Sequence, residues 1–333
     1  MSFFFFGDSA NAGTSAGPPV PVRSPKPIAV GVYVSSWNET AANLDAMTLL
    51  HPAIVRLNAP AWAIVHALDG NQPERDRLTA DLDAAIARVR AMGARPLLVT
   101  SLALSQGATQ LTVLDDAPEL ATHYGALAAR HPGCAFELGN EAEIPGPAGG
   151  STSEALLPDT YAAFFGMLAE AIRSADPTAT IVTAGTSGVP VTWIRAVLAI
   201  TNPDAVGIHP YGVAPLAYAE TIARIGTKLP VWFTEFGKMG LGAGEIAQRD
   251  ALLAYLDRAR GVAAVAVWFA LSDRSAERME SFGLIDGEGR KRLSFFALEK
   301  YKGTFYCEPV SLSTQSTNRF WRDIIFIWRM DTI

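Results

Sequence analysis

Two glutamates lie at the ends of short apolar segments that are typical of strands. Glu141 follows Ala135–Asn140 (AFELGN), and Glu235 ends Val231–Glu235 (VWFTE). Hydrolysis of a glycosidic bond requires two such carboxyl groups, one protonated and one ionised. Groups about 5–5.5 Å apart retain the configuration of the sugar, whereas a gap of about 6.5–9.5 Å admits an inverting water. Spacing along the chain does not give this distance, and either glutamate alone could simply begin a solvated loop.

Eight apolar segments could position these side chains. Their near-continuous apolar character is typical of parallel strands that helices cover on both faces. The segments are Ile28–Val34, Ala53–Asn58, Arg95–Thr100, Ala135–Asn140, Thr180–Ala184, Ala205–His209, Val231–Glu235 and Ala263–Phe269. Apolar residues at helical spacing predict helices between several of them, at Arg75–Ala91, Thr160–Ala175 and Glu245–Arg260.

Eight strand–helix units of roughly 34 residues predict a (β/α)8 TIM barrel with a single catalytic domain. The alternative, a doubly wound open sheet, should carry a glycine-rich nucleotide turn after its first strand. Here that strand continues into Ser35-Ser36-Trp37, and the glycine-rich run 240–244 follows the seventh strand. Reactive groups of a TIM barrel lie at the C-terminal ends of its strands. Strands four and seven would therefore hold Glu141 and Glu235 on opposite sides of one opening.

The barrel is expected to span residues 28–306. Residues 1–27 are rich in Gly, Ser, Ala and Pro, which predicts a flexible leader. Residues 307–333 form a C-terminal extension of unknown role, and its apolar run 324–328 is far shorter than the roughly 18 residues that span a bilayer. We therefore predict no membrane span.

Composition narrows the classes of partner. The chain is 49% hydrophobic and 18% charged, as expected of a folded globular protein. A net charge of −6 without a Lys/Arg cluster argues against a nucleic-acid partner. The first ten residues contain no recognisable signal peptide, although a carbohydrate substrate would fit a secreted or cell-surface protein. Compartment and oligomeric state stay open.

No metal or cofactor is expected. The five histidines show no ligand spacing, and neither CxxC nor HExxH occurs. The two cysteines, Cys134 and Cys307, could pair, but a buried free thiol and a separate thiol in the C-terminal extension is the simpler interpretation.

An ordered set of residues over positions 28–303 resembles clan A glycoside hydrolases, the group of family five cellulases and related β-glycosidases. Asn140-Glu141 and Thr234-Glu235-Phe236-Gly237 resemble their acid/base and nucleophile signatures. Arg56 resembles the second-strand arginine that holds the nucleophile. His209 and Tyr211 resemble the sixth-strand pair, and Trp268 resembles the eighth-strand tryptophan beneath the sugar.

The chain also departs from the cellulase pattern. Its third strand ends Val99-Thr100-Ser101-Leu102 without a histidine, Ala142 follows Glu141 where proline is common, and Gly139 precedes Asn140 where many relatives have tryptophan. These differences point toward β-xylosidase-like or β-glucuronidase-like members.

The resemblance implies a role for each residue. Glu235 would attack as a carboxylate, which Arg56 and Tyr211 would stabilise. Glu141 would hold a proton in an apolar setting and later act as base. Asn140 would hydrogen-bond the sugar 2-hydroxyl.

Strand periodicity also bears on the orientations of the aromatic residues and of Glu137. Ala264, Ala266 and Trp268 share one face by strand periodicity, which would place Trp268 at the mouth beneath the sugar. Trp37 could form an outer sugar subsite or could only pack. Glu137 faces inward by alternation from Glu141, so it either pairs with Arg56 or is reoriented by a bulge.

Two functions are consistent with these patterns. The first is a retaining O-glycoside hydrolase that cleaves a β-linked oligo- or polysaccharide, with Glu141 as acid/base and Glu235 as nucleophile. The second is a non-catalytic glycan-binding barrel in a surface or virion assembly. The presence of both carboxylates favours the enzyme. A metal-dependent barrel hydrolase is disfavoured by the histidine spacing.

Overall fold

The computed structural model describes residues 28–34, 37, 39–61, 72–105, 107–145, 152–240, 244–273 and 281–303. Its eight parallel strands close into a barrel in the order β1 to β8, which confirms the predicted TIM barrel. The strands are β1 (Ala29–Val34), β2 (Ile54–Ala59), β3 (Arg95–Thr100), β4 (Ala135–Asn140), β5 (Thr180–Ser187), β6 (Val206–His209), β7 (Val231–Phe236) and β8 (Val265–Trp268). The expected leader 1–27 and extension 307–333 lie outside the described residues.

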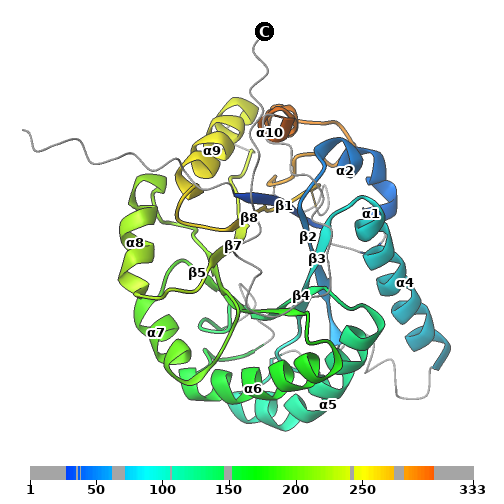
Figure 1. Cartoon of the computed structure of the whole chain (residues 1–333). Coiled ribbons are helices and arrows are strands. Elements are labelled where there is room, and N and C mark those ends of the chain that lie inside the picture. The colour runs from blue at the N-terminus through cyan, green and yellow to red at the C-terminus, as the bar shows by residue number, and fades with distance from the viewer. Residues whose placement is uncertain are drawn as a thin grey trace, which may run out of the picture.

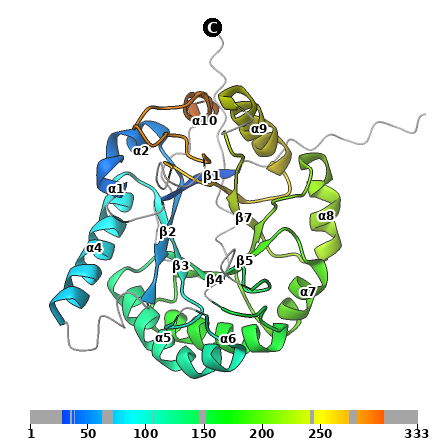
Figure 2. The ribbon, with the colours of Figure 1, turned by 180° about the vertical axis from the view of Figure 1, so that it is seen from behind.

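The helices surround the strands as an outer ring, seen along the barrel axis from its two ends in Figures 1 and 2. They are α1 (Glu39–Ala42), α2 (Leu44–Leu50), α4 (Gln72–Ala91), α5 (Gln110–Arg130), α6 (Pro158–Ala175), α7 (Val191–Ile200), α8 (Tyr218–Ile225), α9 (Gly244–Ala259) and α10 (Leu293–Gly303). Within the described residues, no helix is long and apolar enough to cross a membrane.

Alternate residues of each strand face two separate cores. The barrel interior holds one set of buried side chains, contributed by the strands and the residues that flank them, including Leu97, Val182, Val265 and Val267. The larger core lies between the strands and the helices. This alternation follows from the two-residue period of a strand, and it determines which side chains reach the opening of the barrel.

Two buried tyrosines on the helices bind the C-terminal ends of neighbouring strands. The Tyr124 hydroxyl, from α5, donates to the carbonyl of Ala59 at 2.7 Å and accepts the N–H of Ser101 at 2.7 Å. The Tyr161 hydroxyl, from α6, donates to the carbonyl of Leu138 at 2.8 Å and accepts the N–H of Ala184 at 2.7 Å. Each hydroxyl satisfies backbone groups that would otherwise be buried without partners, so β2, β3, β4 and β5 are held at the end that carries the polar residues.

Candidate active site

Arg56 is the centre of a buried polar network at the C-terminal ends of the strands. Its side chain is 2% exposed and reaches three partners. Nε and Nη2 donate to the two carboxylate oxygens of Glu137 at 2.7 and 3.3 Å. Nη1 donates to Oε2 of Glu235 at 2.9 Å, and Nη2 donates to Oδ1 of Asn140 at 2.7 Å. The planar guanidinium suits this role because its donors diverge in fixed directions.

Glu137 is the counter-ion of Arg56, which supports the first of the two interpretations of this residue. Its carboxylate also accepts the N–H of Gly185 at 3.0 Å and the hydroxyl of Thr234 at 2.8 Å. Burial alone would raise the pKa of Glu137, but the charge of Arg56 and the contacts with Arg56 and His209 lower it to about 2. Burial would likewise lower the pKa of Arg56, yet Glu137 and Glu235 raise it. Both groups are therefore charged at neutral pH.

The end of β4 turns two adjacent side chains toward the opening. Strict alternation would send Asn140 and Glu141 to opposite faces. Instead Asn140 reaches Arg56, and Glu141 reaches His209. The backbone accommodates this because Gly139 has φ 94° and Glu141 has φ 44°, both in the left-handed region. That conformation costs a residue other than glycine roughly 1 kcal/mol, and the Glu141 N–H is held there by the carbonyl of Gly185 at 2.8 Å.

A similar irregularity occurs in β7. Its pairing with β8 shifts register between Phe233 and Phe236. Thr234 and Glu235 lie within this shift, and both reach the interior network, Thr234 at Glu137 and Glu235 at Arg56. An extra residue between two ladder positions is the usual way in which a strand reorients a side chain beside a site.

His209 and Tyr211 each contact one of the two candidate catalytic carboxyls. Nδ1 of His209 lies 3.0 Å from Oε1 of Glu141, and Nε2 lies 3.6 Å from Oε1 of Glu137. Burial would lower the pKa of His209, but the carboxylates of Glu235, Glu137 and Glu141 raise it to about 9. His209 is therefore a cation at neutral pH and donates to Glu141. The Tyr211 hydroxyl donates to Oε1 of Glu235 at 3.2 Å.

The three glutamates of this cluster differ in solvent exposure. The Glu137 side chain is 0% exposed, whereas those of Glu141 and Glu235 are 9% and 14% exposed. Glu137 therefore has no surface for a bound molecule, and its contacts are with the buried network alone. Glu141 and Glu235 keep an accessible edge and can meet a bound molecule.

The chain is similar to known proteins in its fold and not detectably in its sequence. No family model matches the chain, and no curated protein matches it by sequence. Among solved structures, it is similar to GH5_18 from Streptomyces cattleya in complex with GlcNAc, with a TM-score of 0.62 at 15% identity, over 86% of this chain and 83% of that one. It is similar to a GH5-4 broad specificity endoglucanase from Clostridium longisporum, with a TM-score of 0.62 at 16% identity, over 83% and 96%.

A third similar structure is native xylanase 10B from Thermotoga maritima, with a TM-score of 0.57 at 12% identity, over 82% of this chain and 94% of that one. The chain shares their barrel fold. At these identities the likeness carries no residue role, so the roles must be argued from the site itself.

The prediction that Trp268 lines the opening is wrong. Its side chain is fully buried in the outer core, where it meets Phe236 edge-on at 5.4 Å, and its Nε1 donates to the carbonyl of Phe282 at 3.1 Å. The inward residues of β8 are Val265 and Val267, the opposite parity from the one predicted. Trp268 thus has no surface to offer a sugar.

Phe269 is the aromatic residue that the sequence analysis missed. It follows β8 with the inward parity and packs against the interior cluster. Its ring stacks on Tyr33 at 4.9 Å and meets Phe282 edge-on at 5.5 Å. The signal that could have found it is its two-residue spacing from Val265 and Val267, both apolar and β-branched.

Trp37 is half-buried and packs against the outer core. Its Nε1 donates to the carbonyl of Asn58 at 2.8 Å. These contacts favour the packing interpretation of Trp37 over a sugar subsite. Among the described residues, no group of His, Cys, Asp or Glu side chains is arranged to hold a metal ion.

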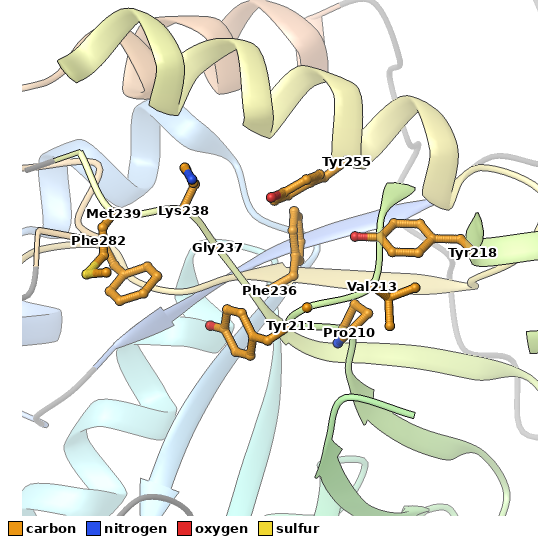
Figure 3. Close-up of a pocket in the computed structure, with 11 residues that line it drawn as sticks. Pro210, Tyr211, Val213, Tyr218, Phe236, Gly237, Lys238, Met239, Tyr255 and Phe282 are labelled. Atoms are coloured by element: carbon orange, nitrogen blue, oxygen red, sulfur yellow. The ribbon is translucent and has the colours of Figure 1, made fainter. Parts of the chain in front are cut away.

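A cavity of about 230 Å³ opens beside Tyr211. Its lining includes five aromatic residues, namely Tyr211, Tyr218, Phe236, Tyr255 and Phe282, and one charged residue, Lys238. Figure 3 shows the Phe236 ring between Tyr211 and Tyr255, with Phe282 and Tyr218 to either side. Phe236 and Tyr218 are buried in the outer core, whereas Tyr211, Tyr255 and Phe282 are half-buried. Half-buried rings of this kind suit the C–H faces of a sugar or an aryl group. Tyr211 connects this cavity to Glu235.

Proposed function

We propose that the chain is a clan A glycoside hydrolase that cleaves β-linked oligo- or polysaccharides with retention, using Glu141 as acid/base and Glu235 as nucleophile. One observation carries this proposal. Two partly accessible carboxyls end β4 and β7, and they are held differently, Glu235 by a cation and a phenol and Glu141 by His209. The similarity in fold to an endoglucanase and a xylanase supports the same reaction class.

Tyr211 binds the carboxylate that is proposed as the nucleophile. Its hydroxyl donates to Oε1 of Glu235 at 3.2 Å, and burial raises the pKa of this phenol well above its ordinary value. The phenol therefore keeps its proton and can stabilise the carboxylate. Retention requires carboxyls about 5–5.5 Å apart, and the labelling experiment below tests it.

In the first step, a carboxylate oxygen of Glu235 attacks the anomeric carbon. The bond from that carbon to the leaving oxygen breaks, and Glu141 transfers its proton to this oxygen. Oε1 of Glu141 accepts a hydrogen bond from His209, which leaves Oε2 to carry the proton. Arg56 fixes Oδ1 of Asn140, and the amide nitrogen of Asn140 would donate to the sugar 2-hydroxyl.

In the second step, Glu141 removes a proton from water as the water attacks the anomeric carbon. The ester bond to Glu235 breaks and the carboxylate returns. The loss of the negative charge on Glu235 favours the switch of Glu141 from acid to base. Once Glu235 is an ester, a negative charge on Glu141 is no longer opposed by a second carboxylate.

Turnover of aryl β-glycosides and polysaccharides by wild type and Glu235→Gln tests the proposal. The expected loss in Glu235→Gln is at least about 10⁴-fold in kcat/KM, because an amide cannot form the glycosyl ester. Glu170→Gln, an exposed change on α6, is the matched control and should retain full activity. A 2-deoxy-2-fluoro glycoside should label Glu235, as read by peptide mass spectrometry. Wild type that binds glycans yet turns them over no faster than the variant is instead a glycan-binding barrel.

The role of Glu141 has a separate test. Glu141→Ala should form the glycosyl ester from a substrate with a good leaving group and then stall, because water is no longer deprotonated. Azide, which needs no base, should restore turnover and give a β-glycosyl azide. An α-glycosyl azide would exchange the two assignments.

A further inference from the structure

Gln248 is a fully buried glutamine on α9 that binds two segments of the cavity wall. Its Nε2 lies 3.1 Å from the carbonyl oxygen of Lys238, 3.1 Å from that of Ser281 and 3.2 Å from that of Phe282. An amide nitrogen has two hydrogens, so these three carbonyls share two donors. Lys238 follows β7, Phe282 lies between β8 and α10, and both line the cavity beside Tyr211. One side chain therefore joins two segments that are distant in sequence and adjacent in this wall.

The orientation of the Gln248 amide is itself fixed. The hydroxyl of Ser294, which is also fully buried, donates to Oε1 of Gln248 at 2.8 Å. This bond requires Oε1 to accept, so Nε2 is the atom that faces the backbone carbonyls. A further bond between the same two segments runs from the N–H of Gly240 to the carbonyl of Ser281 at 2.7 Å.

Other side chains hold the backbone at Phe282. Nε1 of Trp268 donates to the carbonyl of Phe282 at 3.1 Å. At the next residue, Nη1 of Arg292 donates to the carbonyl of Gly283 at 2.6 Å, and Oδ1 of Asp273 accepts the N–H of Gly283 at 2.9 Å. Trp268, which the sequence predicted to lie beneath the sugar, thus helps to hold another aromatic residue in place.

The Phe282 ring lies between the opening of the barrel and the aromatic cavity. It meets Phe269 edge-on at 5.5 Å and Tyr211 edge-on at 6.3 Å. A Cβ on Gly237 would lie 3.0 Å from Cδ1 of Phe282, so this glycine leaves room for the ring. Phe282 is half-buried and lines the cavity, as Figure 3 shows. Because Tyr211 also contacts Glu235, the ring adjoins the place where a reacting sugar would meet its neighbour.

We propose that Phe282 determines which unit is accepted beside the reacting sugar, and that Gln248 is the positioning residue that holds it there. The inference rests on the proposed function and deepens it. A ring held at its backbone and touched along its edges presents a fixed apolar surface, which suits the flat C–H face of a neutral pyranose better than a bulky branched group. Without Gln248, three carbonyls lose a buried donor, so the segment and its ring would shift.

Gln248→Met keeps the length of the side chain but cannot donate, and it tests the positioning role. KM for β-linked oligosaccharides should rise about fivefold, whereas kcat/KM for a monosaccharyl fluoride, which places nothing beside the reacting sugar, should stay unchanged. Phe282→Ala should raise KM for the oligosaccharides about tenfold through loss of the ring itself. Gln72→Met makes the same change at an exposed position on α4 and should leave both substrates unaffected. Equal losses on both substrates in Gln248→Met would reduce Gln248 to a structural role.

The double variant tests whether Gln248 acts through Phe282. In a Phe282→Ala background, Gln248→Met should cause no further rise in KM, because the ring that it positions is gone. The same rise in both backgrounds would overturn the inference. Ser294→Ala removes only the hydroxyl that orients Gln248, so it replaces Gln248→Met in these assays if that variant does not fold. It should raise KM in the same substrate-dependent way by a smaller factor, and an unchanged KM would also overturn the inference.

A spectroscopic measurement does not depend on turnover. In protein labelled with meta-fluorophenylalanine, the ¹⁹F resonance of Phe282, assigned with Phe282→Leu, is shifted by the neighbouring rings of Tyr211 and Phe269. Gln248→Met should move this resonance, and Gln72→Met should not. If wild type hydrolyses nothing, the proposed function fails while this comparison still tests the positioning. An unchanged resonance in Gln248→Met would overturn the inference even in an active enzyme.

Discussion

Arg56 and Glu235 are joined by a single 2.9 Å hydrogen bond, while the other donors of Arg56 are occupied by Glu137 and Asn140. The position of Glu235, the proposed nucleophile, therefore depends on the orientation of one guanidinium plane as well as on the hydroxyl of Tyr211. The same plane fixes the amide of Asn140, so two groups proposed to touch the sugar share one support.

Arg56→Lys should show whether the site needs only the positive charge of Arg56 or also the fixed plane of its guanidinium. The ammonium keeps the positive charge but cannot reach three partners in a fixed plane, so we expect kcat/KM to fall about 100-fold through misplacement of Glu235. The free energy of unfolding should fall by about 3 kcal/mol, because a buried network loses donors. Arg77→Lys on α4, an exposed ion pair, is the matched control for both assays. Full activity in Arg56→Lys would show that charge alone suffices.

Gly185 in β5 leaves the space that the network occupies. A Cβ at this position would lie 2.1 Å from Nε2 of His209, 2.5 Å from Oγ1 of Thr234 and 2.6 Å from Oε1 of Glu137. None of these atoms can retreat without breaking a buried contact. Gly185→Ala should therefore lower the free energy of unfolding by about 2–4 kcal/mol and abolish turnover.

Gly166→Ala is the matched control for Gly185→Ala. A Cβ on Gly166 would meet nothing within 4 Å, and the residue lies within α6, where alanine stabilises a helix by roughly 0.5–1 kcal/mol relative to glycine. Urea unfolding should thus move in opposite directions for the two variants. If Gly185→Ala leaves the free energy of unfolding unchanged, His209 and Glu137 can rearrange to admit the methyl group.

The barrel and the residues that end its strands could be predicted because both depend on local patterns. Continuous apolar runs mark buried parallel strands, and a polar residue after such a run lies at the opening. The structure accordingly brings Glu141, Glu235, Arg56, His209 and Tyr211 into one connected network. The direction of each side chain within a strand was harder to predict.

Alternation fails where the backbone departs from an extended conformation. The left-handed φ angles at Gly139 and Glu141 and the register shift within β7 depend on neighbouring strands, so no local pattern announces them. In β8 the small residues Ala264 and Ala266 suggested an inward face, and either parity fits a segment that is apolar throughout. The outer layer provides room for Trp268 beside Phe236, which is why the larger side chain faces outward.

His209 should make the stability of the fold depend on pH. Its pKa in the folded chain, about 9, exceeds the value of about 6.5 expected when unfolded. Since the folded state binds the proton more tightly, this contribution is complete below about pH 6.5 and is lost as the pH rises through about 9. The difference in unfolding free energy between wild type and His209→Asn should shrink by up to about 3 kcal/mol over this range. A difference that stays constant from pH 6 to 9.5 would contradict a cationic His209.

The aromatic cavity beside Tyr211 should hold the part of the substrate next to the reacting sugar. Val213→Trp would fill a lining position, so KM for oligosaccharides and aryl glycosides should rise about tenfold, the loss expected for one apolar contact surface. A monosaccharyl fluoride places nothing beyond the reacting sugar, and its kcat/KM should be unchanged. Leu216→Trp, in the same segment but 76% exposed, should leave both substrates unaffected. An equal loss on both substrates would instead place the cavity at the reacting sugar itself, and no loss on either would show that the substrate does not enter it.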